Sequence, residues 1–233
     1  MKSRMDRIYQ PPLPSLVSAI RIVSDLPGFL AQNLEQETSG AERSCMDRYL
    51  RILDALESRA LFDCSLLDIG CSSGFFSYLF AITFCRQVTA VDDSRASAFG
   101  YGGNAFLGPL RAACEEYGLH HIEIVDAPIE RFLKEHAGRR WDVVLCLSVL
   151  HHFYTGYGDD PSRGRMNPLQ LGSLFQAIGN ATGTVLYLEV DHGRVPADFL
   201  EEFSEASGLH HNRVIGSSSS AVGETRNLME FWK

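Results

Sequence analysis

The stretch SLLDIGCSSGFFSYLFA, residues 65–81, decides the fold. An apolar run ends in Asp68, two glycines follow with serines between them, and the chain then turns apolar again. The order strand, glycine-containing turn, helix is the form of a nucleotide-binding turn. Gly70 permits a sharp exit from the strand, Gly74 lets the helix pack closely, and the first amides of the helix point at a ligand. The stretch therefore predicts a cofactor site at the end of a buried strand.

Beyond this turn, short apolar runs alternate with helical stretches. Such runs suit strands that are covered on both faces, and their alternation with helices indicates βαβ units in a mostly parallel sheet. The runs are 66–69, 88–91, 122–125, 143–147 and 185–190, and the helical stretches are roughly 74–84, 105–117, 128–136, 168–179 and 196–206. Two further candidate strands, 210–215 and 225–232, are joined by Gly216 and four serines. This junction is too short for a helical crossover, so we expect an antiparallel hairpin with the serines in a solvated turn.

The pattern predicts a Rossmann-like α/β fold with helices on both faces of the sheet. Residues 43–58 place apolar side chains along one side, as an amphipathic helix does. Residues 1–42 are expected to form a short helical N-terminal appendage that could cover the site, although its early prolines exclude a helix at the start. Residues 43–233 are expected to form the main domain.

The charge, the apolar runs and the cysteine spacing argue against several classes of function. The chain has 233 residues, a net charge of −8 and a pI near 5.5, which argues against a nucleic-acid partner because such partners usually require a basic face. It contains no run of 18 apolar residues and its first residues resemble no secretory signal, so neither a membrane span nor export is expected. Six cysteines without a CxxC pair indicate reduced thiols in a cytoplasmic protein, and no metal site is expected.

The acids suggest which cofactor the turn binds. Asp92 lies 24 residues after Asp68, at the end of the apolar run VTAVD, where an acid can hold ribose hydroxyls. Asp68 would repel a pyrophosphate and attract an amino group, and Ser72 replaces the glycine that lets a backbone meet a pyrophosphate. A cationic cofactor is therefore favoured, and a nicotinamide enzyme is the alternative.

The motifs, taken together, resemble those of the class I S-adenosylmethionine-dependent methyltransferases. LDIGCSSGFFS is similar to their first motif, VTAVDDS to the acidic loop after the second strand, IVDAPIE to the adenine-binding segment, WDVVLCLSVLHHF to the fourth-strand motif and TVLYLEV to the fifth strand. The resemblance covers about residues 45–232. GCSSGFFS, LSVLHHF and LYLEV also resemble the methyltransferase half of bacterial O-antigen chain-terminating enzymes.

The resemblance implies a seven-stranded sheet with an antiparallel last strand, and S-adenosyl-L-methionine as cofactor. Asp68 and Gly70 would face its methionine end, and Asp92 its ribose. The other residues that this resemblance assigns to cofactor binding are Ser72 and Gly74 in the first motif, Asp93 in the acidic loop, Asp126 and Ala127 at the adenine, and Leu147 and Ser148 below the sulfonium. Ser72 departs from the family, which usually has glycine there.

The candidate catalytic residues follow the fourth and fifth strands. Methyl transfer needs an aligned nucleophile and often a base that removes its proton. His151 and His152 follow the fourth strand, and a histidine accepts a proton near neutral pH, so one of the pair is a candidate base, with His152 preferred over His151. A packing or helix-capping role for these histidines is the alternative. Glu189 could accept a proton or bind substrate, or it could be a charge exposed at a strand end. Arg48 could pair with the cofactor carboxylate or lie on the surface.

The sequence therefore predicts a methyltransferase that acts on a small-molecule or glycan acceptor, in the first place on oxygen and with a histidine as base. An RNA-modifying methyltransferase and a non-catalytic cofactor-binding subunit are the alternatives. The fourth-strand motif lacks the Asn/Asp-Pro-Pro-aromatic tetrad associated with base-amino methylation, which disfavours RNA. The oligomeric state stays open.

Overall fold

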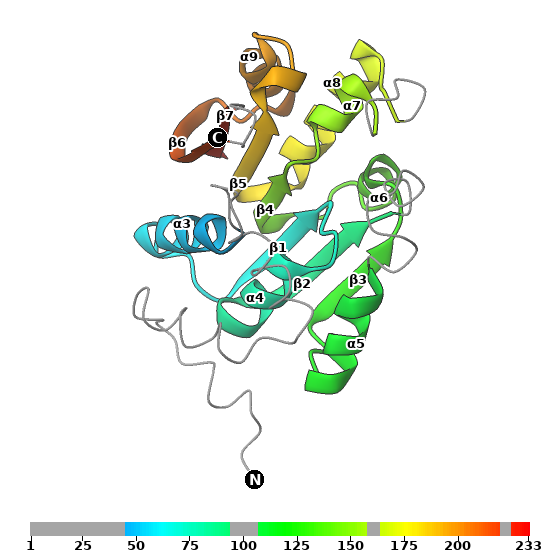
Figure 1. Cartoon of the computed structure of the whole chain (residues 1–233), viewed down its shortest axis with the longest axis vertical. Helices are drawn as coiled ribbons and strands as arrows, with labels where there is room; N and C mark the ends of the chain where they lie inside the picture. The colour runs from blue at the N-terminus through cyan, green and yellow to red at the C-terminus, as the bar shows by residue number, and fades with distance from the viewer. Residues whose placement is uncertain (1–44, 94–106, 158–163, 220–224) are drawn as a thin grey trace.

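The computed structural model describes residues 45–93, 107–157, 164–219 and 225–233. They form a seven-stranded sheet in the order β3-β2-β1-β4-β5-β7-β6, with helices on both faces (Figure 1). The Rossmann-like fold expected from the alternating pattern is thus confirmed. The proposed appendage, residues 1–42, lies outside the described residues.

The elements agree closely with the apolar runs. The strands are β1 (Cys64–Ile69), β2 (Cys85–Asp92), β3 (Ile122–Asp126), β4 (Trp141–Leu147), β5 (Thr182–Asp191), β6 (His211–Ser219) and β7 (Thr225–Trp232). The helices are α3 (Cys45–Ser58), α4 (Phe75–Thr83), α5 (Leu107–Tyr117), α6 (Ile129–Glu135), α7 (His151–Thr155), α8 (Pro168–Ala181) and α9 (Phe199–Ser207), with a 3-10 turn η4 (His192–Arg194).

The strand directions bring the functional candidates to one edge of the sheet. Strands β1 to β5 pair in parallel, whereas β7 runs antiparallel to both β5 and β6. The carboxyl ends of β1 to β5 therefore share one edge, and β7 begins at that edge, where Arg226 pairs with Asp191. Ligands bind at this edge in open α/β sheets.

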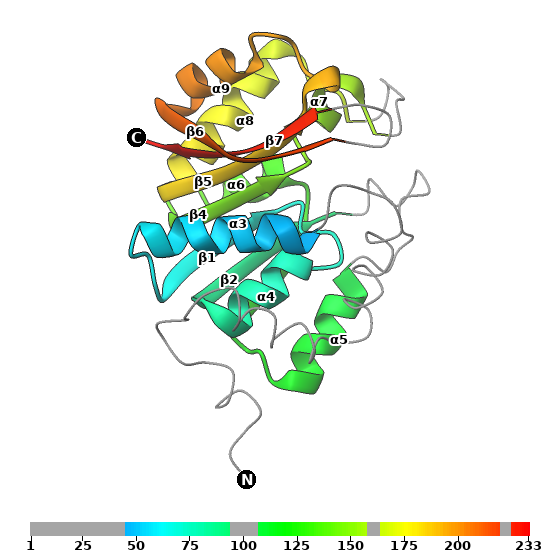
Figure 2. The same ribbon diagram turned by 60° about the vertical axis from the view of Figure 1, so that its left-hand side comes forward.

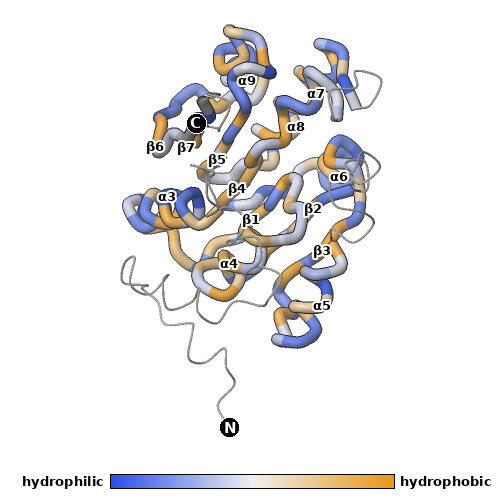
Figure 3. Tube along the Cα trace, in the orientation of Figure 1, coloured by the Kyte–Doolittle hydropathy of each residue, from blue (hydrophilic) through white to orange (hydrophobic). Residues whose placement is uncertain are grey.

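Two apolar layers cover the sheet. Helices α3, α4 and α5 pack on one face, and α6, α8 and α9 pack on the other (Figure 2). Figure 3 shows hydrophilic and hydrophobic residues alternating around the turns of α3 and α5, as expected of helices with one buried side. In α3 the buried side includes Tyr49, Ile52 and Leu56, which confirms the amphipathic helix predicted there.

One sequence expectation about the hairpin is wrong. The first three of the four serines do not form the turn, because β6 continues through Gly216 to Ser219, which pairs with Thr225 of β7. The backbone ladder to β7 holds these poor strand formers, and the Ser217 hydroxyl donates to Asn227 Oδ1 at 2.8 Å. β6 is an edge strand with one neighbour, where small polar residues are tolerated.

The cysteines and the helix lengths can be compared with the sequence expectations. All six cysteines are free thiols, four of them buried and two half-buried. In the ranges given above, no helix has the length and apolar character needed to cross a bilayer.

Candidate functional site

The turn between β1 and α4 is tied to the neighbouring strand. The N–H groups of Gly70 and Cys71 donate to the Val91 carbonyl of β2 at 2.8 and 3.1 Å. Gly70, Ser72 and Gly74 all have left-handed backbone angles, with φ of 71°, 52° and 86°. Ser72 thus adopts the conformation that glycine usually supplies, at a cost of about 1–2 kcal/mol. The departure from the family pattern at this position therefore leaves the shape of the turn intact.

Gly74 illustrates how little room the turn leaves. A Cβ built on it would lie 2.6 to 2.8 Å from side-chain atoms of Leu110 in α5. We expect Gly74→Ala to destabilise the protein by about 2–4 kcal/mol, because overpacking adds to left-handed strain. Gly138→Ala is the matched control, since Gly138 has a φ of 94° and nothing within 4 Å of a built Cβ. Urea unfolding of both variants checks this, and equal losses would contradict the packing argument.

Asp68 is a buried acid at the end of β1. Its Oδ2 accepts a hydrogen bond of 2.6 Å from the Ser77 hydroxyl. The pKa of Asp68 is raised to about 7, chiefly by burial; the negative charge of Asp92 acts in the same direction, whereas hydrogen bonds from Ser77 oppose the shift. An ammonium group placed against Asp68 would restore its ionised form.

This raised pKa predicts pH-dependent cofactor binding. Below about pH 7 Asp68 is protonated, so binding of the S-adenosylhomocysteine ammonium must displace a proton and its affinity should fall toward tenfold per pH unit. Calorimetry between pH 5.5 and pH 8, in buffers of different ionisation enthalpy, measures both the affinity and the proton release expected in this window. Asp68→Asn should abolish the proton release, and a wild-type affinity independent of pH would contradict the assignment.

The same shift has a consequence for stability. The pKa of Asp68 is near 3.8 in the unfolded chain and about 7 in the folded one. The contribution of this group to the free energy of unfolding is therefore fully present below pH 3.8 and is lost progressively as the pH rises toward 7. Ligand-free Asp68→Asn should therefore gain stability over the wild type at pH 8, measured by urea unfolding. Equal stabilities at that pH would argue against the burial cost.

Asp92 organises the next part of the edge. Its two carboxylate oxygens accept from the backbone N–H groups of Ser72 at 2.6 Å and Asp93 at 2.7 Å. Asp126 lies beside it in register on β3 and is exposed, and the Ala127 N–H donates to the Asp92 carbonyl at 3.0 Å. Asp93 is half-buried. The structure therefore brings these four residues together.

The set of carboxylate acceptors fits S-adenosylmethionine. Asp68, Asp92 and Asp126 stand at the ends of three adjacent strands, β1, β2 and β3. Carboxylates accept hydrogen bonds from an ammonium, from ribose hydroxyls and from an adenine amino group, which this cofactor offers in that order along its length. Three acids would repel the pyrophosphate of a dinucleotide.

The end of β4 supplies the other predicted cofactor residues and both histidines. Leu147 is buried and Ser148 has a left-handed φ of 64°. The chain then enters α7, a five-residue helix that the sequence pattern did not predict. His151 is 2% exposed and therefore packs in the core, whereas His152 is half-buried. The His152 ring stacks on Tyr157, with centroids 4.8 Å apart and planes 9° apart.

Glu189 and Arg48 are not the surface charges that one alternative predicted. Glu189 is 1% exposed, and Arg48 is 8% exposed. Arg48 Nη1 donates to Glu189 Oε2 at 3.1 Å. A carboxylate so buried and paired is poorly placed to take a proton from an acceptor, which favours a structural role for Glu189.

Sequence reasoning missed a second charge pair at this edge. Arg226 Nη2 donates to Asp191 Oδ2 at 3.0 Å, and its Nη1 lies 3.5 Å from Ser148 Oγ. Asp191 is 1% exposed. The signal available was the position of Asp191 as the last residue of the fifth apolar strand.

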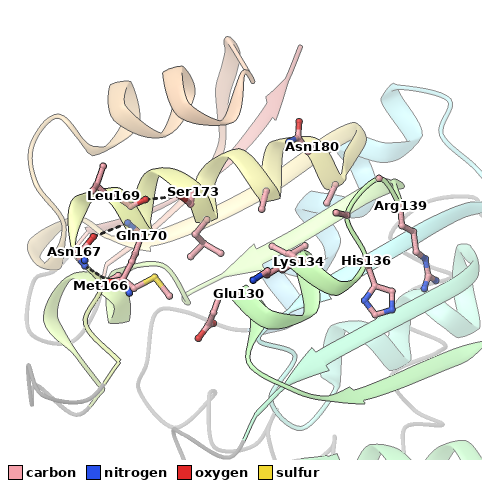
Figure 4. A pocket seen from close by; sticks show the side chains of 16 residues that line it. Glu130, Lys134, His136, Arg139, Met166, Asn167, Leu169, Gln170, Ser173 and Asn180 are labelled. Atoms are coloured by element: carbon pink, nitrogen blue, oxygen red, sulfur yellow. Dashed lines mark hydrogen bonds between the residues drawn. The ribbon is translucent and has the colours of Figure 1, made fainter.

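A separate cavity lies away from these residues. A groove of about 610 Å³ runs between α6 and α8, and Figure 4 shows side chains such as Lys134 and Ser173 around it. Asn167 caps α8 at one end of this groove by accepting from the Gln170 N–H at 3.0 Å. None of the predicted site residues lines this groove. Over the residues with described positions, no three His, Cys, Asp or Glu side chains form a cluster suited to a metal.

Comparison with known families and structures agrees with this geometry. Residues 67–164 match the family described as "Methyltransferase domain". The matched part begins within β1 and ends after α7. The search of curated proteins returned no match.

Many solved structures match this chain, among them the following three. The bifunctional kinase-methyltransferase WbdD is 22% identical with a TM-score of 0.63, covering 92% of this chain and 46% of its own. PH1948 from Pyrococcus horikoshii, a proposed RNA methyltransferase, is 15% identical with a TM-score of 0.57, covering 92% and 96%. An S-adenosylmethionine-dependent methyltransferase from Clostridium acetobutylicum is 9% identical with a TM-score of 0.58, covering 82% and 93%. The chain thus spans less than half the length of WbdD.

Proposed function

We propose that this chain, which carries a class I S-adenosylmethionine-dependent methyltransferase domain, transfers a methyl group to a hydroxyl oxygen of a small-molecule or glycan acceptor. The alignment of Asp68, Asp92 and Asp126 on three neighbouring strand ends carries the cofactor part of this proposal. S-adenosylmethionine, when bound, supplies the electrophilic methyl group.

The chain's own residues divide the work. Asp68 binds the ammonium, Asp92 the ribose and Asp126 the adenine amino group, and Leu147 and Ser148 form the floor beside the methyl group. His152, which follows that floor in α7, takes the proton of the acceptor hydroxyl. His151 supports α7 from the core because it is buried.

Two observations support the acceptor class. The net charge of −8 disfavours a phosphate-rich polymer. The sequence motifs resemble those of O-antigen chain-terminating enzymes, in which a methyltransferase is one half. The similarity to the bifunctional kinase-methyltransferase WbdD, which covers 92% of this chain, agrees with that resemblance.

Radiolabelled S-adenosylmethionine tests the reaction. The purified protein is incubated with hydroxylated small molecules, with oligosaccharides and with RNA, and label transfer is counted for each. Transfer to a hydroxyl that depends on His152 supports the proposal. Labelling of RNA alone, or cofactor binding without transfer to any of the acceptors, would favour the RNA-modifying or non-catalytic alternatives.

A further inference from the structure

A buried carboxylate holds the floor of the proposed methyl-transfer site in place. Glu189 Oε2 accepts from the Ser148 hydroxyl at 2.6 Å, and the Glu189 carbonyl accepts from the Ser148 N–H at 2.8 Å. Ser148 is thereby held through both its side chain and its backbone. A residue other than glycine stays left-handed only where its surroundings enforce that conformation. The two hydrogen bonds to Glu189 hold Ser148 in that conformation.

Arg48 connects this arrangement to α3. Its Nη1 donates to the same Glu189 Oε2 at 3.1 Å, and its Nη2 donates to Cys45 Sγ at 2.9 Å. Its guanidinium also lies 5.2 Å from the ring centre of Phe76, in the first turn of α4. Arg48 therefore links the start of α3, the first motif helix and the end of β5. A buried carboxylate is costly to leave without its cation, so Glu189 depends on Arg48.

We propose that Arg48 and Glu189 are positioning residues that fix Ser148 under the cofactor, so that cofactor binding depends on the docking of α3. This inference rests on the proposed function, and it gives Glu189 a role other than that of a base. Neither residue touches the reacting atoms in this account. Their effect passes through the backbone of Ser148.

The residue that directly follows α3 offers a matched control. Arg59 Nε, just after α3, donates to Glu230 Oε1 of β7 at 2.6 Å, and Arg213 Nε donates to Glu230 Oε2 at 2.6 Å. Glu230 is fully buried and pairs in register with Tyr187, two residues before Glu189 along β5. Its hydrogen-bond partners include no residue assigned to the cofactor. This second pair therefore resembles the first in the burial of its carboxylate and in its link to the segment of α3, although Arg59 is more exposed than Arg48. It differs in the residues that the carboxylate contacts.

The experiment compares the two pairs in the full chain. Arg48→Met and Glu189→Gln are set beside Arg59→Met and Glu230→Gln, and each protein is characterised by thermal unfolding and by calorimetric titration with S-adenosylhomocysteine below its unfolding range. We expect the first two variants to bind about tenfold or more weakly, since small misplacements at a site cost up to about 100-fold. The control variants should lose thermal stability yet bind within about threefold of the wild type.

Two further variants keep the test decisive. Arg48→Lys keeps the charge but loses the fork of donors, and it carries the test if Glu189→Gln does not fold. The double variant Arg48→Met/Glu189→Gln should bind no more weakly than the weaker single variant, because the two residues act as one unit. Equal affinity losses in both pairs would overturn the inference, as would unchanged affinity in Arg48→Met and Arg48→Lys. A wild type that does not bind S-adenosylhomocysteine would instead overturn the proposed function.

Discussion

Replacing Asp92 by asparagine is expected to weaken S-adenosylhomocysteine binding by about 10- to 150-fold. The carboxylate is assigned to the ribose hydroxyls, and a hydrogen bond to a charged group contributes about 1.5–3 kcal/mol. The two carboxylate oxygens of Asp92 also accept hydrogen bonds from the backbone N–H groups of Ser72 and Asp93. An asparagine side chain has only one oxygen that can accept, so one of these hydrogen bonds is lost. Loss of charge and a loosened turn act in the same direction. Calorimetric titration measures the change.

Asp142→Asn is the control for this variant. Asp142 lies at the opposite edge of the sheet, near the start of β4, where its Oδ2 accepts from the Ser65 N–H and hydroxyl at 2.8 Å. Its removal should lower stability and leave the affinity for S-adenosylhomocysteine unchanged. If Asp92→Asn binds as tightly as Asp142→Asn, the assignment of Asp92 to the ribose is wrong.

The second large effect is expected on turnover. His152→Ala should lower kcat by about 10²- to 10⁴-fold, which is the usual contribution of a positioned general base. The affinity for S-adenosylhomocysteine should stay within about threefold of the wild type, because His152 is assigned to the acceptor. The acidic limb of the pH–rate profile, which reports the base, should disappear with the imidazole.

His136→Ala provides the comparison. His136 follows α6, where its ring stacks on Phe132 and its Nδ1 lies 2.9 Å from the Phe132 carbonyl. A variant there tests the loss of a half-buried imidazole away from the proposed site, and we expect an unchanged kcat. Turnover retained in His152→Ala would remove this residue from the mechanism.

The strand framework was predictable because its signals are local. Strands β1 to β5 are apolar over most of their length, and each is followed by a helical pattern, so a single pass along the chain locates them. The acids at the ends of these strands lie side by side because the strands are parallel. Asp92 and Asp126 meet in register on β2 and β3 although 34 residues separate them in the chain.

The features that could not be predicted from the sequence depend on long-range contacts or are very short elements. Arg48 and Glu189 are 141 residues apart, and nothing in either local pattern indicates that they pair. Helix α7 has five residues, too few to display a helical period. The serines of β6 have low strand propensity and are held by pairing with β7, which no local signal shows.

The most direct test of the account is a calorimetric titration of the wild-type chain at pH 8, with S-adenosylhomocysteine in one experiment and NAD in the other. Three acids at adjacent strand ends predict saturable one-to-one binding of S-adenosylhomocysteine and no heat of binding with NAD. Binding of NAD, or the absence of S-adenosylhomocysteine binding by a folded protein, would contradict the account.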